Sequence, residues 1–307
     1  MVTFAAAAST GHRPVPKVRR YCPACGGDTA QLPLWHKNGS QVFRCAGCGL
    51  GAATAPNFDP AACYTAEYFS SQTKGGYPDY RASETVLRAE FRRAVAFVRR
   101  IVPSGRLLEI GAAYGFFLIE AAAHYDVHGI EIAGEAAAFA RRRGLDVRTG
   151  RPTRQSFAAI GAVDVIVMLD VIEHLEEPGN VLRLCAQSLR PGGAVILTTP
   201  DFASPLARLS GRRWRNMTPP YHLWYFTAES LARLAAAAGL AIAEVAHPWK
   251  RVPAALVLQL LGRSVGIGWP PSLLSTASRL AIPVNLFDVM RAVLRKPPAP
   301  CGTDGRA

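Results

Sequence analysis

The chain has 307 residues, half of them hydrophobic, with a formal net charge of +13 and an isoelectric point near 9.8. This length accommodates one α/β domain of about 200–250 residues and a small additional module. No run of 18 or more uncharged apolar residues occurs, and the N-terminal stretch MVTFAAAAST is too weakly apolar for a signal peptide. We therefore expect no transmembrane segment and a cytoplasmic location.

The positive charge would permit a nucleic-acid or other anionic partner, because clustered Lys and Arg residues concentrate anions. The clusters here are short, as at Arg99–Arg100, Arg141–Arg143 and Arg212–Arg213. We interpret most of the charge as solvated surface. Nucleic acid is the less favoured partner, and an anionic small molecule also fits.

The N-terminal region contains two paired cysteine motifs. Residues 1–20 are basic, contain proline and lack a periodic apolar pattern, which predicts a mobile arm. Cys22 and Cys25 then form one CxxC motif, and after nineteen residues Cys45 and Cys48 form a second. This spacing brings four thiolates into tetrahedral reach of one zinc ion and predicts a structural zinc ribbon over residues 21–50. Disulfides and a redox motif are the alternatives, and a reducing cytosol disfavours the first.

Residues 51–82 are predicted to connect this module to the main domain. Residues 51–62 have the composition of a linker, and residues 64–80 are rich in aromatic residues and glycine. Such a loop could form a lid over a ligand, or its aromatic side chains could attach the ribbon to the main domain. Both interpretations stay open.

A buried strand and a glycine-bearing turn follow an amphipathic helix predicted over residues 83–101. The strand is the apolar run 107–110, with Glu109 near its carboxyl end, and the turn contains Gly111, Ala113 and Gly115 in the order E-x-G-x-A-x-G. Ligands of open α/β sheets bind at the carboxyl ends of the strands. The two glycines allow the backbone to turn sharply and approach a ligand closely.

This turn does not match a dinucleotide fingerprint, because Ala113 and the spacing differ from G-x-G-x-x-G. Glu131 lies twenty residues after Gly111, at the end of the second apolar strand VHGIEI, where a carboxylate can accept both ribose hydroxyls. Two acidic strand ends without a phosphate-binding turn fit a ligand that has a ribose and a positive charge but no phosphate. S-adenosylmethionine is such a ligand.

The motifs as a set resemble class I S-adenosylmethionine-dependent methyltransferases, above all the bacterial small-molecule branch. The resemblance covers about residues 65–296 and continues through DVIVMLDVIEHLEEP (164–178), LRPGGAVILTTPD (189–201) and YHLWYFTAESLARLAAAAGL (221–240). It implies an α/β fold with a seven-stranded Rossmann-like sheet, mostly parallel with a C-terminal antiparallel hairpin, within a domain spanning 83–296. The cofactor-binding residues that follow from the motifs are Glu109, Gly111, Ala113, Gly115, Glu131, Ile132 and Asp170, with Tyr77 and Tyr80 of the aromatic loop near the methionine end.

The acceptor pocket is predicted on the long connection 200–226, because connections of this length in a compact fold are usually functional. Its polar and aromatic residues make it the expected roof of the pocket, with Arg208, Trp214, Tyr221 and Trp224 as substrate contacts. His222 resembles the histidine of the family's H-L-x-x-F element, and His174 precedes a helix in VIEHLEEP. Either histidine could be the general base, since the reference pKa of histidine is near 6.5.

The C-terminal region is expected to complete the sheet with strands at 240–245 and 288–294. Between them, residues 249–285 are apolar, with prolines and three arginines, Arg251, Arg263 and Arg279. A helical lid, a dimer contact and a peripheral membrane surface all fit this inserted segment, and the sequence does not choose among them. Residues 297–307 are expected to form a disordered tail.

The sequence thus predicts S-adenosylmethionine-dependent methylation, at oxygen or carbon, of a small molecule such as a sugar, a glycolipid or a natural-product intermediate. Two alternatives stay open. The first is an RNA methyltransferase whose zinc ribbon binds nucleic acid, disfavoured because DVIE replaces an N/D-P-P-Y/F element after the fourth strand. The second is a non-catalytic binding protein, disfavoured by the intact acidic and glycine positions of the cofactor motif.

Overall fold

The computed structural model describes residues 18–55, 59–64, 69 and 79–297. Tyr77, the predicted tail after residue 297 and most of the predicted arm lie outside these residues.

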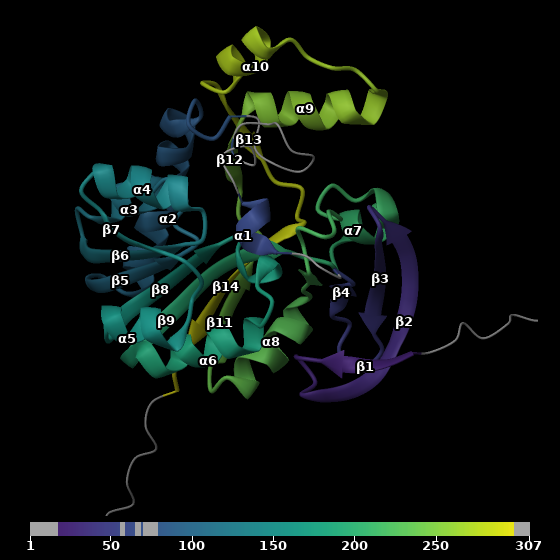
Figure 1. Ribbon diagram of the computed structural model, residues 1–307, viewed down its shortest axis with the longest axis horizontal. Helices are drawn as coiled ribbons and strands as arrows, with labels where there is room; N and C mark the ends of the chain where they lie inside the picture. The colour runs from purple at the N-terminus through teal and green to yellow at the C-terminus, as the bar shows by residue number, and fades with distance from the viewer. Residues whose placement is uncertain (1–17, 56–58, 65–68, 70–78, 298–307) are drawn as a thin grey trace, which may run out of the picture.

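A seven-stranded mixed sheet forms the centre of the main domain, as predicted (Figure 1). Its strand order is β11-β14-β9-β8-β5-β6-β7. The five strands β5 to β9 run parallel to one another, whereas β14 is antiparallel to β9 and β11 is antiparallel to β14. The strands are β5 (Gly105–Ile110), β6 (Tyr125–Glu131), β7 (Asp146–Thr149), β8 (Val163–Leu169), β9 (Leu189–Pro200), β11 (Ala241–Ala246) and β14 (Val289–Arg295).

Helices cover both faces of this sheet because alternate apolar residues of each strand point to opposite sides. On one face, Leu107 of β5 packs with α2 (Glu84–Ile101), α3 (Phe116–Ala121) and α4 (Gly134–Arg142). On the other face, its neighbour Leu108 belongs to the cluster with α5 (Arg154–Ile160), α6 (Pro178–Ser188) and α8 (Ala228–Ala237). Both faces are therefore buried, which explains the continuous apolar runs of the central strands.

The N-terminal module is a separate antiparallel sheet beside the main domain (Figure 1). It consists of β1 (Val18–Cys22), β2 (Gly27–Lys37), β3 (Ser40–Cys45) and β4 (Gly51–Ala53), and its fifth strand is β10 (Trp224–Tyr225) from the long connection. Two boundaries differ from the predicted ones. Residues 18–20 of the expected arm belong to β1, and residues 51–53 of the expected linker form β4, because backbone pairing with β2 and β10 orders them.

The inserted segment forms a projection built on a two-stranded ribbon. The strands β12 (Lys250–Pro253) and β13 (Ala281–Val284) pair antiparallel and carry α9 (Ala254–Val265) and α10 (Pro271–Ala277). These two helices lie well away from the central sheet (Figure 1). Among the described residues, no helix combines the length and the apolar character needed to cross a bilayer.

Short elements complete the fold between the strands. They are α1 (Pro60–Cys63), the 3-10 turns η2 (Ile172–His174) and η3 (Gly211–Arg213), and α7 (Pro205–Ser210). The first two lie beside the cavity described next, and the others belong to the long connection 200–226.

Candidate active site

A cavity of about 780 Å³ opens at the carboxyl ends of β5, β6 and β8. This is the edge of the sheet where α/β folds bind ligands. The lining of the cavity includes the predicted cofactor residues Gly111, Ala113, Glu131, Ile132, Asp170 and Tyr80, which we call the cofactor end. It also includes His174, His222 and residues of the inserted segment, which we call the acceptor end.

The turn after β5 requires glycine at positions 111 and 115. Gly111 has a φ of +79°, and a Cβ atom there would lie 2.5 Å from Cγ2 of Val171. Gly115 has a φ of +76° and begins α3, and a Cβ atom there would lie 2.5 Å from Cδ1 of Leu145. Only glycine fits both positions without strain. Gly115 does not line the cavity, and its conformation shapes the turn.

Glu131 holds the glycine turn in place from the neighbouring strand. Its carboxylate accepts hydrogen bonds from the backbone amides of Ala113 and Ala133, each at 2.7 Å. Ala113 has a left-handed φ of +45°, which this bond helps to maintain. Burial raises the pKa of Glu131, although the two amides oppose the rise. The carboxylate lies at the cavity wall, where it can also accept ligand hydroxyls.

Glu109 lies behind the turn rather than in the cavity wall. It is buried, and its Oε2 atom has no hydrogen-bond partner among the described residues. Burial and the nearby Glu131 raise the pKa of Glu109 well above its usual value. A cation bound in the cavity would favour the ionised form of this carboxyl.

Asp170 follows β8 in the left-handed conformation, with a φ of +55°. Its carboxylate accepts hydrogen bonds from Thr198 Oγ1 at 2.8 Å and from Lys250 Nζ at 2.9 Å. Burial opposes ionisation of Asp170, but Lys250 and Thr198 outweigh it and lower the pKa. Lys250 thereby connects the inserted segment to the cofactor end of the cavity.

His174 and His222 lie together, with their ring centroids 4.7 Å apart. Nδ1 of His174 is 2.8 Å from the backbone carbonyl of Tyr221 and 2.7 Å from the hydroxyl oxygen of Tyr64. A hydrogen on Nδ1 is compatible with both contacts, because each oxygen can accept, and this tautomer leaves Nε2 as the basic nitrogen. Burial lowers the pKa of His174, so the ring is neutral at pH 7. Burial, assisted by His174, lowers the pKa of His222 well below its usual value.

Glu173 is buried beneath the two histidines. Thr199 donates a hydrogen bond to its Oε2 atom at 2.9 Å, and Oε1 has no partner among the described residues. Burial, followed by repulsion from Asp170, raises the pKa of Glu173 to about 8. Glu173, His174 and His222 also offer ligand atoms within 4.8 Å of one another, a spacing compatible with a metal ion.

None of the four predicted substrate residues lines the cavity. Trp214 is only 1% exposed, and its indole nitrogen donates to Asp288 at 2.9 Å. Trp224 donates to the carbonyl of Leu175 at 2.8 Å, and Arg208 is exposed on α7. Tyr221 contributes its backbone carbonyl to His174. The large aromatic residues of the connection therefore serve packing and internal hydrogen bonds.

Other residues of the connection 200–226 and of the inserted segment line the cavity wall instead. They are Arg215, Asn216, Thr218, Lys250, Leu256, Val257, Leu260 and Asn285. Arg215 is fixed by two hydrogen bonds to Asp288, at 2.8 and 3.0 Å. The apolar character of residues 249–285 was a visible signal for this wall, but the sequence did not show which face of α9 would point inward.

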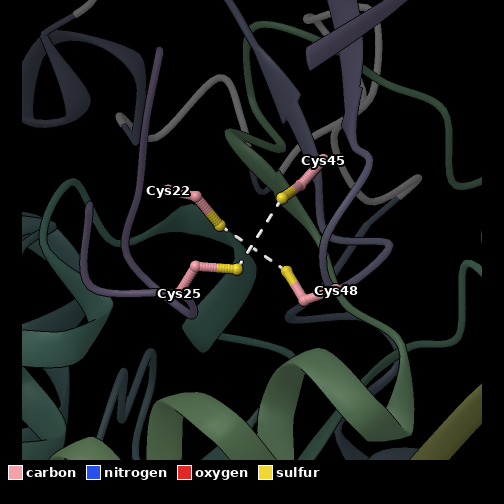
Figure 2. Close-up of side chains that lie close together, drawn as sticks. All are labelled: Cys22, Cys25, Cys45 and Cys48. Carbon is pink, nitrogen blue, oxygen red and sulfur yellow. Dashed lines mark hydrogen bonds between the residues drawn. The ribbon is translucent and has the colours of Figure 1, made fainter. Parts of the chain in front are cut away.

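The four cysteines of the N-terminal module converge, as the paired motifs predict (Figure 2). Their sulfur atoms all lie within 4.8 Å of one another, with Cys22 Sγ 3.5 Å from Cys48 Sγ and Cys25 Sγ 3.8 Å from Cys45 Sγ. A zinc ion bonded to four sulfurs at about 2.3 Å separates them by about 3.8 Å. The cluster therefore fits a tetrahedral zinc ion.

The mixed seven-stranded sheet with an acidic crevice at its carboxyl edge defines the class of S-adenosylmethionine-dependent methyltransferases of class I. Comparison with known families agrees, because residues 83–245 match the model of a methyltransferase domain. This match covers more than half of the chain, and the chain belongs to this methyltransferase domain family.

Curated relatives include ubiquinone biosynthesis O-methyltransferases. That of Caulobacter sp. (strain K31) is 33% identical over 131 residues, which cover 39% of this chain and 52% of the relative. That of Caulobacter vibrioides is 36% identical over 95 residues, covering 29% of this chain and 38% of the relative. The chain thus spans about half the length of the curated relatives it matches.

Similar solved structures include an S-adenosylmethionine-dependent methyltransferase from Thermotoga maritima, 20% identical with a TM-score of 0.45, covering 70% of this chain and 92% of that one. Another is the magnesium protoporphyrin IX methyltransferase of Synechocystis with bound S-adenosylhomocysteine. It is 12% identical with a TM-score of 0.45, covering 71% of this chain and 87% of that one.

Proposed function

We propose that the chain transfers a methyl group from S-adenosylmethionine to an oxygen or carbon atom of a small molecule such as a sugar, a glycolipid or a natural-product intermediate. The observation that carries this proposal is the buried pair Glu109 and Glu131 beside a cavity that is also lined by the neutral His174. Oxygen methylation is also the activity named for the Caulobacter relatives.

The residues of the cofactor end suit S-adenosylmethionine. Glu131 would accept the ribose hydroxyls while its amide partners keep the carboxylate fixed. The unpartnered Oε2 atom of Glu109 would be ionised by a nearby positive charge. The amides of Gly111 and Ala112 donate to the carbonyl of Ile130, and that of Ala113 donates to Glu131, so these amides of the turn are not directed at a phosphate. When bound, the cofactor would supply an electrophilic methyl group on its sulfonium.

The acceptor end must align the acceptor, exclude water and remove a proton. In the tautomer with a hydrogen on Nδ1, which faces the Tyr221 carbonyl and the Tyr64 hydroxyl, the Nε2 atom of His174 can accept that proton. The resulting imidazolium would be stabilised by this carbonyl and by Asp170, both of which favour the protonated form. Arg215 and Asn216 would contact polar groups of the acceptor. His222 is the less suited base, since burial and His174 disfavour its protonation more strongly.

Calorimetric titration with S-adenosylmethionine tests the cofactor assignment. We expect micromolar binding by the wild type, and loss of binding on Glu131→Ala. Glu135→Ala is the matched control, because this exposed glutamate lies four residues further on and does not line the cavity. A folded wild type that does not bind the cofactor, or equal binding by the Glu131→Ala variant, would contradict the assignment.

We also propose that Cys22, Cys25, Cys45 and Cys48 hold a structural zinc ion. The four sulfurs would complete the coordination shell, so the ion would stabilise the module and take no part in chemistry. Elemental analysis of purified protein should find one zinc per chain, and Cys45→Ser should release it. Cys63→Ser is the control, since Cys63 lies outside the cluster. Stoichiometric zinc in Cys45→Ser would refute the site.

A further inference from the structure

The projecting segment carries most of the exposed apolar side chains in the described part of the chain. We call residues 249–287 the α9–α10 platform. Eight of the twelve exposed large apolar residues lie on it, namely Trp249, Leu261, Ile267, Leu273, Leu280, Ile282, Leu286 and Phe287. Scattered surface hydrophobics are normal, but a concentration of this kind marks an interaction surface.

The α9–α10 platform has little core of its own. Its internal cluster consists of Ala254, Ala255 and Ala277, with Leu258 and Leu274 packed against them. A different face of α9, with Leu256, Val257 and Leu260, lines the cavity. The backbone amide of Arg251 donates to Glu90 of α2 at 2.9 Å, which anchors the base of the platform. Most of the exposed apolar residues of the platform thus belong neither to its internal cluster nor to the cavity wall.

The positive charge of the platform favours an anionic partner. Residues 249–287 contain four lysines and arginines and neither aspartate nor glutamate, and of the four cations Lys250 is paired with Asp170. The next acidic residue, Asp288, is buried and bound to Arg215. Arg251 and Arg279 are exposed beside the apolar residues. Apolar and aromatic side chains flanked by cations are the composition of segments that lie in the interface of an anionic bilayer.

A second copy of the chain fits this surface less well. In a two-fold dimer the same surface patch is used on both subunits, so the platform of one subunit would lie against the platform of the other or close to it. Arg251 and Arg279 would then approach their own counterparts without an acidic residue on the platform to pair with them. An anionic lipid surface supplies the missing negative charge.

We propose that the α9–α10 platform docks the protein on the surface of an anionic membrane, with its exposed apolar side chains inserted among the lipid headgroups. This inference goes beyond the proposed methyl transfer and does not require it. Where the proposed function holds, the apolar inner face of α9 would accept the chain of a lipid-like acceptor, because the same helix borders both the bilayer and the cavity.

Flotation with lipid vesicles tests the proposal on the full chain without cofactor. Binding is expected to vesicles of phosphatidylcholine mixed with phosphatidylglycerol, and to be about tenfold weaker with phosphatidylcholine alone. The double variant Leu280→Asp/Phe287→Asp should lower binding about tenfold or more, because two apolar side chains would no longer insert. These side chains are 60% and 57% exposed, so the fold should persist, as circular dichroism would check.

Leu209→Asp is the matched control, because Leu209 is 88% exposed on α7 but lies outside the platform. It should bind vesicles as the wild type does. Wild-type protein that stays off anionic vesicles would overturn the proposal, and so would equal losses in the control and the double variant. Concentration-dependent dimers that the double variant abolishes, without vesicle binding, would instead assign the platform to self-association. Loss of cofactor binding in the Glu131→Ala variant would leave these results unchanged, so the two proposals fail separately.

Discussion

Replacing Gly51 with alanine should weaken the joint between the cysteine module and the main domain. Gly51 pairs with Tyr225 where β4 meets β10. A Cβ atom at this position would lie 2.8 Å from Cβ of Tyr225 and 2.9 Å from Cε1 of Phe202. Both distances are shorter than carbon atoms tolerate, and Tyr225 is almost fully buried, so the backbone of one strand must move.

The cost of overpacking by one methyl group is about 1–3 kcal/mol. For a domain of this size, that corresponds to a fall in Tm on the order of 2–10 °C. Methyl transfer should also fall, because the same connection supplies the Tyr221 carbonyl to His174 and the Leu223 amide to the carbonyl of Glu173. Cofactor affinity should stay within about twofold, since β5 and β6 form that end of the cavity.

Thermal melts, calorimetric cofactor titration and zinc analysis should be measured on the same preparations. Gly27→Ala is the control, because Gly27 lies in the same module and a Cβ atom added there would have no atom within 4 Å. Its Tm should stay close to the wild-type value. Equal melting temperatures for Gly51→Ala and the wild type would refute the view that β4 and β10 form a tight joint. Loss of zinc from Gly51→Ala would place the damage in the cysteine cluster instead.

Three further predictions concern the titratable groups. Cofactor affinity should rise with pH as Glu109, whose pKa burial raises, loses its proton, and calorimetry over a pH series should find this dependence weaker in Glu109→Gln. His174→Asn should lower kcat about 10²–10⁴-fold without changing cofactor affinity. Because burial lowers the pKa of His174, the wild-type rate should fall only when the pH drops below the usual pKa of histidine. A carboxyl whose pKa is raised in the folded state stabilises the fold at low pH, and this stabilisation is lost as the pH rises through the folded-state pKa. Since the pKa of Glu173 is raised to about 8, wild-type Tm should decline as the pH approaches about 8. Glu173→Gln should reduce that decline.

The glycine turn beside the cavity was predictable because its signals are local. Gly111 and Ala113 line the cavity, Glu109 and Gly115 lie outside its lining, and the two glycine positions are fixed by backbone sterics at the end of a strand. Glu131 follows at the end of the next strand, which pairs directly with the first. The antiparallel end of the sheet was expected from the resemblance to class I methyltransferases, and β14 does pair antiparallel with β9.

The acceptor end was not predictable because its contacts join residues far apart in sequence. Trp214 is an aromatic residue on a long connection, which suggested a ligand contact, yet its indole is bound to Asp288, 74 positions away. The Lys250 contact with Asp170 spans 80 positions. Buried indole and charged groups require hydrogen-bond partners. The sequence shows that such residues are present, but it does not identify their partners.

The two ends of the cavity therefore depend on different parts of the fold. The cofactor end belongs to the core of the parallel sheet, with both faces covered by helices. The acceptor end is held from outside that core. Asn38 of the cysteine module donates to the carbonyl of Pro219 at 2.8 Å, in the connection that also carries His222. A perturbation of this attachment should thus impair acceptor turnover before it impairs cofactor binding, because the core strands retain their own packing.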